Sequence, residues 1–338
     1  MNARRSRGFT LIDVMVGSAL CLLLVGLIGA LYLNSKQLTR VNEAIGRLQE
    51  NGRFIVQQLN DNLRMAGFFG CAGVSVAPVN VLGLTTYPYQ FEKAIAANHG
   101  DGSAFAPALD ATIAGLSPAP LVDSDVVTVR RIEGTGMQLI RSMINGTSTL
   151  QVSAGSAVAT GDILLVADCT ASAIFQATGV AGGVIGHDTG GGAPGNASDD
   201  LGHAYHTDAT LYRMVSRTYY VAPSAARPGV NSIWVNTVPN YTGVAQPMEL
   251  VEGVERFVLL FGEDLDNDRA ANRYVTADLV TTWANVVSAK PMVLVASTRD
   301  NMATGPQPYT FNGATTTPTD RRIRSSLVSV VTLRNRVP

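Results

Sequence analysis

The chain has 338 residues and a formal net charge of −1 at neutral pH. This charge argues against a nucleic-acid-binding protein, which normally carries a basic face or stripe. Apolar residues make up 46% of the chain and charged residues only 15%, and glycine is abundant. This mixture favours an exported, β-rich domain over a cytosolic helical enzyme.

The sharpest signal lies in the first 33 residues. Three arginines within the first seven positions precede Gly8, and an apolar segment begins at Phe9. The 20 residues from Val14 to Leu33 carry no charge. At about 1.5 Å per helical residue they span about 30 Å, the thickness of the hydrocarbon core of a bilayer. The basic flank predicts that the N-terminus stays cytoplasmic and that the rest of the chain is exported.

This segment differs from an ordinary secretory signal, because no small-residue cleavage motif closes it before Lys36. Any cleavage is therefore expected before the apolar stretch, and an ordinary single-span anchor is the alternative. Asp13 lies inside the apolar run. A carboxylate at the centre of a membrane helix costs about 2.5–3.5 kcal/mol on insertion scales, so Asp13 is a candidate functional residue.

The run Gly8-Phe9-Thr10-Leu11-Ile12-Asp13 resembles the class III signal of type IV prepilins. The resemblance implies that a prepilin peptidase cleaves between Gly8 and Phe9 and methylates the new N-terminal Phe9. Asp13 would then be the fifth residue of the mature chain, where the family usually has the longer glutamate. It also implies an assembly role for Asp13, whose carboxylate would pair with the N-terminal ammonium of a neighbouring subunit.

A single helix is predicted from Phe9 to Ala66, with residues 9–33 in the membrane. Beyond the apolar segment, apolar residues recur at alternating steps of three and four, which indicates one apolar stripe. Gly67 is a natural C-cap. A coiled-coil stalk is the alternative interpretation of the stripe. Its members are Leu38, Val41, Ile45, Leu48, Ile55, Leu59 and Leu63, with Gly52 in one of the apolar positions.

From residue 67 the pattern changes to short apolar runs separated by glycine, proline, asparagine and serine, which predicts an antiparallel, two-sheet domain over 67–338. The segments 179–202 and 300–318 are expected to be loops. The predicted class is therefore α+β and pilin-like, with a leader over 1–8. The expected strands are 126–129, 163–166, 218–221, 233–235, 257–261, 291–295 and 327–331.

Three cysteines are present. Cys21 lies in the apolar segment and is most simply a small apolar residue. Cys71 and Cys169 both lie on the exported side, where disulfides persist. They form the one intramolecular pair available there, and free buried thiols are the alternative.

An acidic run holds the candidate metal ligands. Asp264, Asp266 and Asp268 alternate along the chain, like the first three ligands of a calcium loop. Arg269 stands where such a loop has its glycine, and Val275 stands where it has its last glutamate. Calcium is therefore a candidate ligand, and a charged hairpin turn is the alternative. No other cofactor is expected.

The histidines do not predict an active site. His203 and His206 are spaced as in some metal sites, but they adjoin a glycine-rich segment without a third ligand at a telling distance. We therefore expect them, together with His187, to be solvated loop residues. Because the sequence also lacks nucleophile-elbow, P-loop and paired-cysteine motifs, we expect the chain not to be an enzyme.

Several later segments resemble PilW-type minor pilins. They are Leu63–Cys71, Asp168–Thr170 with Phe175–Gly179, Leu250–Glu255 with Phe261-Gly262, and Arg321–Arg324 with Leu333–Arg336. The resemblance implies a subunit that helps to start pilus assembly within a minor-pilin complex at the fibre tip. The implied partners are other minor pilins, the major pilin, a tip adhesin, the prepilin peptidase and the inner-membrane assembly platform.

The same resemblance implies an inner-membrane location before assembly and a place in the pilus afterwards. A J-type minor pseudopilin of a type II secretion system is the first alternative, and a membrane-anchored periplasmic enzyme or receptor is the second. Twitching motility, adhesion and DNA uptake all stay open as the use of such a pilus.

Overall fold

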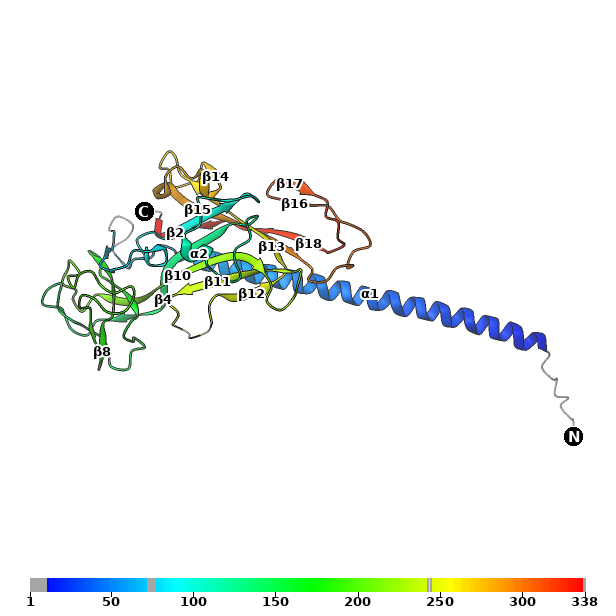
Figure 1. The fold of residues 1–338 in the computed structure, drawn as a ribbon, viewed down its shortest axis with the longest axis horizontal. Helices are drawn as coiled ribbons and strands as arrows, with labels where there is room; N and C mark the ends of the chain where they lie inside the picture. The colour runs from blue at the N-terminus through cyan, green and yellow to red at the C-terminus, as the bar shows by residue number, and fades with distance from the viewer. Residues whose placement is uncertain (1–10, 72–76, 242, 244, 337–338) are drawn as a thin grey trace, which may run out of the picture.

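The computed structural model describes residues 11–71, 77–241, 243 and 245–336. One long helix, α1 (Leu11–Arg64), projects from a β-rich body that packs on its C-terminal part (Figure 1). This arrangement confirms the predicted α+β class. The predicted helix is confirmed from Leu11 to Arg64, whereas Phe9 and Thr10 lie outside the described residues.

The predicted apolar stripe of α1 packs on the body only in its C-terminal part. Leu48, Ile55 and Leu59 are buried, whereas Leu38 is exposed. Gly52 is buried on the same side, where an added Cβ would lie 2.5 Å from Leu327 Cδ1. The missing side chain therefore lets α1 approach the sheet closely at this point.

The chain leaves α1 through a short turn that ends at Gly67, which has a φ of +70°. The N–H of Gly67 donates to Arg130 O at 3.2 Å. The Nδ2 group of Asn335 donates to Ala66 O at 3.2 Å, so the end of the chain helps to cap the end of α1. The expected C-cap at Gly67 thus lies three residues beyond the last helical residue, Arg64.

The first sheet has nine strands among the described residues and runs in the order β1-β7-β6-β10-β4-β2-β3, with β11 and β12 continuing from β10. All pairs in it are antiparallel except β1 with β7. Its strands are β1 (Val79–Asn80), β2 (Ile95–Gly100), β3 (Phe105–Ala106), β4 (Val126–Gln138), β6 (Ile163–Ala167), β7 (Ser172–Gln176), β10 (Thr210–Pro223), β11 (Asn231–Val238) and β12 (Met248–Glu252).

The second sheet is antiparallel and has five strands among the described residues, in the order β14-β13-β15-β18, with β19 also pairing with β15. The two main sheets agree with the predicted two-sheet arrangement, although two smaller sheets accompany them. Six of the seven expected strands lie within strands of these two sheets, whereas the run 327–331 is divided between β18 and β19. Its strands are β13 (Val254–Glu263), β14 (Arg273–Val275), β15 (Val286–Ala296), β18 (Arg324–Val328) and β19 (Val331–Thr332).

One core joins α1 to both sheets. It contains Ile55 and Leu59 of α1, Val127 of the first sheet, and Phe257 and Val293 of the second. Packing of these side chains removes apolar surface from water, at about 25 cal/mol per Å². The second half of α1 therefore belongs to the folding unit of the body.

Asp125 ties the two sheets together. Its N–H donates to Phe257 O at 2.8 Å, and its Oδ2 accepts from Leu259 N at 2.7 Å. Its Oδ1 lies 2.7 Å from His99 Nδ1, and this hydrogen bond raises the pKa of His99. A buried carboxylate is tolerated here because these donors satisfy it.

The end of the body that lies beyond the C-terminus of α1 has a core of its own, made by β6, β7, the start of β10 and a small sheet (Figure 1). That sheet contains β5 (Leu150–Gln151), β8 (Gly179–Ala181) and β9 (Val184–Gly186). The prediction of one loop over 179–202 is therefore wrong in part. Gly182 and Gly183 form the turn of the β8–β9 hairpin. Because the segment is rich in glycine and its apolar runs are short, its sequence indicated a loop.

The predicted loop over 300–318 also contains a hairpin, formed by β16 (Tyr309–Phe311) and β17 (Ala314–Thr316). Aromatic side chains hold it to the body, because the Arg256 guanidinium lies 5.6 Å from the Phe311 ring centre and that of Arg324 lies 5.4 Å from the Tyr309 ring centre. The remaining helical turns are α2 (Ala111–Ala114), η1 (Tyr87–Tyr89), η2 (Ala277–Leu279), η3 (Trp283–Asn285) and η4 (Arg334–Arg336).

Candidate functional site

The part of α1 from Leu11 to Leu33 presents an apolar surface that is exposed along its whole length. Every residue from Leu11 to Arg40 is exposed. Of the described helices, α1 alone is long and apolar enough to cross a membrane. So large an exposed apolar surface marks a segment that is covered by lipid or by other chains.

Asp13 lies in the first turn of α1. Its place at the start of the apolar surface agrees with the position that the prepilin signal implies for the fifth mature residue. Gly8 and Phe9, the predicted cleavage and methylation residues, lie outside the described residues. Their processing stays a prediction.

A polar network couples the C-terminal end of α1 to the first sheet. Asn62 is buried, and its Oδ1 accepts from Arg217 Nη1 at 3.2 Å. Arg217 Nη2 in turn contacts both carboxylate oxygens of Glu133, at 2.9 and 2.7 Å. The network fixes the rotation of α1 against β10 and β4. This network was not predicted from the sequence, although Asn62, a polar residue beside Leu63 of the predicted apolar stripe, was a usable signal.

A disulfide joins Cys71 to Cys169, as predicted. Cys71 follows the exit of α1, and Cys169 lies in the turn between β6 and β7. The bond therefore ties the base of the long helix to the end of the body that has a separate core around β6, β7 and the small sheet, which we call the outer lobe. The alternative of buried free thiols is wrong, and Cys21 is the free cysteine of the described chain.

The acidic run forms the turn between β13 and β14, which pair as an antiparallel hairpin. Asp264, Asp266 and Asp268 can each offer a carboxylate oxygen within 4.8 Å of the others. Asp264 Oδ1 accepts from Asn267 N at 2.7 Å, and its Oδ2 accepts from Arg269 N at 2.9 Å. Burial would raise the pKa of Asp264, but the hydrogen bonds to its carboxylate, of which these two are the largest, outweigh burial and keep that pKa below its usual range.

The base of this turn is held by Glu263, which is fully buried. Its carboxylate accepts from Thr281 Oγ1 at 2.8 Å and from Arg273 Nε at 2.9 Å. Burial would raise the pKa of Glu263, but these hydrogen bonds, together with those from the N–H groups of Thr281 and Thr282, lower it to about 2. The turn is therefore anchored by an ionised carboxylate at neutral pH, and its three aspartates are held close together by the fold itself.

The turn suits a hard divalent cation, because its oxygens are anionic and already gathered. We predict that calcium binds to the full-length chain in detergent and raises its melting temperature. At about ten times the dissociation constant, binding adds about 1.4 kcal/mol to the free energy of unfolding. Calorimetry should show weaker binding after Asp266→Ala, with Asp188→Ala as the control on another loop. If millimolar calcium produces no binding heat and no change in melting temperature, calcium binding is excluded and the run is a charged hairpin turn.

The expected solvation of the histidines is wrong for His187. This side chain is buried, its Nε2 lies 2.9 Å from Ser148 O, and its ring packs on Phe175. His206 is exposed, as expected. His203 is half-buried and its Nε2 lies 3.0 Å from Asp168 Oδ2. Asp168 also accepts from the backbone of the turn that carries Cys169, so this contact supports the disulfide region.

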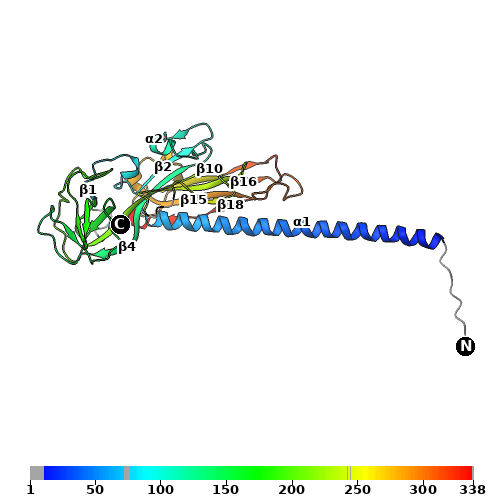
Figure 2. The same ribbon diagram turned by 60° about the horizontal axis from the view of Figure 1, so that its bottom comes forward.

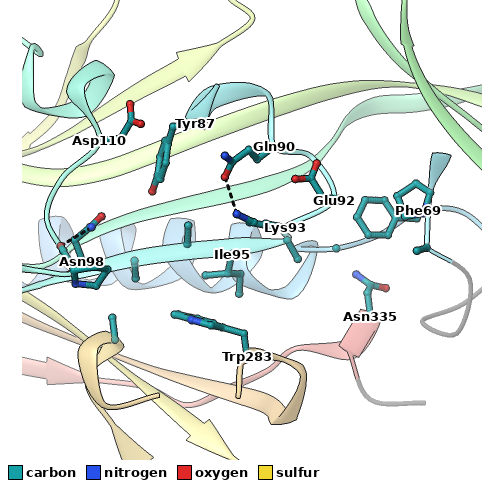
Figure 3. Close-up of a pocket in the computed structure, with 18 of the residues that line it drawn as sticks. Phe69, Tyr87, Gln90, Glu92, Lys93, Ile95, Asn98, Asp110, Trp283 and Asn335 are labelled. Atoms are coloured by element: carbon teal, nitrogen blue, oxygen red, sulfur yellow. Dashed lines mark hydrogen bonds between the residues drawn. The ribbon is translucent and has the colours of Figure 1, made fainter. Parts of the chain in front are cut away.

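A cavity of about 710 Å³ lies along strand β2 (Figure 3). The side chains of Tyr87 and Gln90 lie on one side of the strand, and that of Trp283 lies on the other. Lys93 Nζ donates to Gln90 Oε1 at 3.1 Å at its rim. Asp110, also at the rim, accepts from Thr112 and begins α2. Lys93 and Asp110 therefore form hydrogen bonds within the protein, to Gln90 and at the start of α2.

The predicted site residues do not converge on one centre. Asp13 lies at the start of α1, the disulfide at its C-terminal exit, and the aspartates on the hairpin of the second sheet. Such a distribution suits a subunit whose helix and body each meet different neighbours.

A family model described as type IV pilus-assembly protein W matches residues 218–335. The match runs from within β10 to η4 and covers about a third of the chain, including the whole second sheet. No curated protein and no solved structure matches the chain. The match supports a relation to type IV pilus assembly.

Proposed function

We propose that this chain is a minor pilin of a type IV pilus that helps to start fibre assembly at the tip. The observation that carries the proposal is the exposed apolar half of α1, continuous with a second half that is built into the core of the body. One helix can therefore hold the body at the membrane and later pack against other helices. The family match favours pilus assembly over the type II secretion alternative.

The proposed assembly route begins in the inner membrane. A prepilin peptidase removes residues 1–8 and methylates Phe9, and the body folds on the exported side with its disulfide. Other minor pilins, the major pilin and a tip adhesin are the proposed partners, with the assembly platform acting from the membrane. The role is structural, and we propose no catalysis by this chain.

Intact-mass analysis of the chain from cells with and without prepilin peptidase tests this proposal. With the peptidase, the chain is expected to begin at methylated Phe9. Without it, the mass should be that of the full precursor. The Gly8→Val variant should stay uncleaved in peptidase-containing cells and show the mass calculated for its own full-length precursor. A product that begins at Met1, or after Leu33, in wild-type cells would contradict the pilin function.

A further inference from the structure

A contact just beyond the apolar segment indicates how close the body would lie to the membrane. Gln37 Nε2 of α1 donates to Asn301 O at 3.2 Å. Gln37 follows Leu33 by four residues, or about 6 Å along the helix. The headgroup layer extends about 5–7 Å beyond the hydrocarbon core. With Leu33 at the edge of that core, the loop around Asn301 lies at the level of the lipid headgroups.

The shape of the body agrees with this placement. The segment that carries β16 extends along α1 toward its N-terminal half in both ribbon views (Figures 1 and 2). It is part of the same loop, because Asn301 and Arg321 lie at its two ends. Met302 N and Ala303 N donate to Arg321 O, at 3.1 and 2.9 Å, which closes the loop at its base.

Four basic side chains gather at this level, and we call them the basic collar: Lys36, Arg40, Arg299 and Arg321. All four residues are exposed. Arg40 and Arg299 line the same hollow of about 380 Å³ between α1 and the loop. Arg321 N donates to Asp300 Oδ1 at 2.8 Å, which places Arg321 beside Arg299.

The collar has a local excess of positive charge in a chain whose formal net charge is −1. Within the described part of the chain, none of its four side chains forms an ion pair. Acidic residues also lie close by. Glu43 and Glu252 line the hollow with Arg40 and Arg299, and Glu252 pairs with Arg227. Asp300 Oδ1 accepts from Arg321 N at 2.8 Å and from Asn301 N at 2.6 Å. These amides also lower the pKa of Asp300. The collar can therefore offer its four cations to an external anion.

We propose that the basic collar binds the phosphates of anionic phospholipids in the exported-side leaflet of the membrane that holds α1. Long basic side chains reach headgroups easily from this depth while their stems stay over apolar surface. The contact would hold the body upright on the membrane before assembly and would be given up when α1 leaves the bilayer. The proposal rests on the membrane anchoring in the proposed function.

Hydrogen exchange on the full-length chain tests the collar. The chain is placed in nanodiscs of phosphatidylcholine alone or with about one third phosphatidylglycerol. Exchange over residues 297–323 is expected to be about threefold slower with the anionic lipid. About 0.5 M salt should remove the difference, because the screening length then falls to a few Å.

A collar variant and a matched control separate this effect from net charge. Four charges are removed in each, and all eight residues are exposed. The collar variant should lose the lipid dependence, and the control should keep it. The collar variant carries Lys36→Gln, Arg40→Gln, Arg299→Gln and Arg321→Gln. The control carries Arg53→Gln, Arg64→Gln, Arg141→Gln and Arg334→Gln.

The outcomes distinguish this proposal from the anchor on which it rests. Flotation with phosphatidylcholine vesicles measures anchoring alone, which needs no anionic lipid. A chain that floats but exchanges equally in both lipids overturns the collar proposal and leaves the anchor standing. A chain that fails to float contradicts both. Loss of the lipid effect in the control variant as well as in the collar variant would show that net charge, and not the collar, governs it.

Discussion

Replacing Asp13 by alanine is expected to reduce the number of pili per cell by about tenfold while export and cleavage continue. Cleavage before Phe9 would create an ammonium, and Asp13 lies in the first turn of the same helix. Between subunits, the carboxylate of one chain can meet the ammonium of the next in an apolar fibre core. Leaving one charge of a buried pair without its partner costs about 3–5 kcal/mol. Since 1.4 kcal/mol is a factor of ten, even part of this cost would suppress assembly.

Two further variants show whether charge or shape matters. Asp13→Asn keeps the shape and removes the charge, so it should assemble as poorly as Asp13→Ala. Asp13→Glu keeps the charge on a longer arm and should assemble at least as well as the natural chain. Counting pili by electron microscopy, with intact-mass analysis of the same cells, measures assembly and cleavage together. Normal piliation in the Asp13→Asn strain would mean that the subunit occupies a position where no such pair forms.

The elements that local sequence predicts are those whose apolar residues follow one period. The helix, confirmed over Leu11–Arg64, and six of the seven expected strands are of this kind. Strand β4 shows the limit, because the apolar run 126–129 predicts only its first part. The strand continues to Gln138 through charged residues and glycines, since its partner β10 supplies the pairing. A Cβ on Gly136 would lie 2.4 Å from Thr210 Cγ2, and no local pattern shows that contact.

The run 327–331 illustrates a second limit. It predicts one strand, but the structure has β18 and β19 with a break between them. Ser329 N donates to Pro291 O, and Pro291 has no N–H to return. A proline opposite the run therefore interrupts the ladder. The partner residue lies 38 positions away in the sequence and is identified only when the register is known.

The candidate sites divide in the same way. The prepilin signal and the alternating aspartates were predicted from short runs of neighbouring residues. The cysteine pair was predicted because the exported part of the chain has two cysteines. Residues whose role depends on distant partners were missed or misassigned. His187 is buried because Asn196 Nδ2 donates to its carbonyl and Ser148 meets its ring, and neither contact has a local signature. The Gln37–Asn301 contact joins positions 264 residues apart.

Removing the disulfide with Cys71→Ala and Cys169→Ala is expected to lower the free energy of unfolding by about 4 kcal/mol. The two residues are 98 positions apart. In the chain-entropy model, a loop of that length constrains the unfolded state by about 4–5 kcal/mol, and less where the unfolded chain retains structure. For a body of this size the melting temperature should fall by about 10 °C. This fall in melting temperature can be measured by thermal unfolding of the full-length chain in detergent, monitored by circular dichroism.

The position of the bond indicates where the loss should appear first. Cys71 joins the exit of α1 to the turn of β6 and β7, so the outer lobe would lose its covalent tie to the helix. Hydrogen exchange should therefore rise more over residues 150–209 than over the second sheet.

Cys21→Ala is the matched control, because Cys21 is exposed on the apolar half of α1 and makes no disulfide. Both paired cysteines are exposed, so a maleimide would reach them if they were free thiols. Because they are joined in a disulfide, a maleimide without reductant should label neither of them in the natural chain. Full labelling of both, or an unchanged melting temperature in the double variant, would show that the bond does not form in the cell.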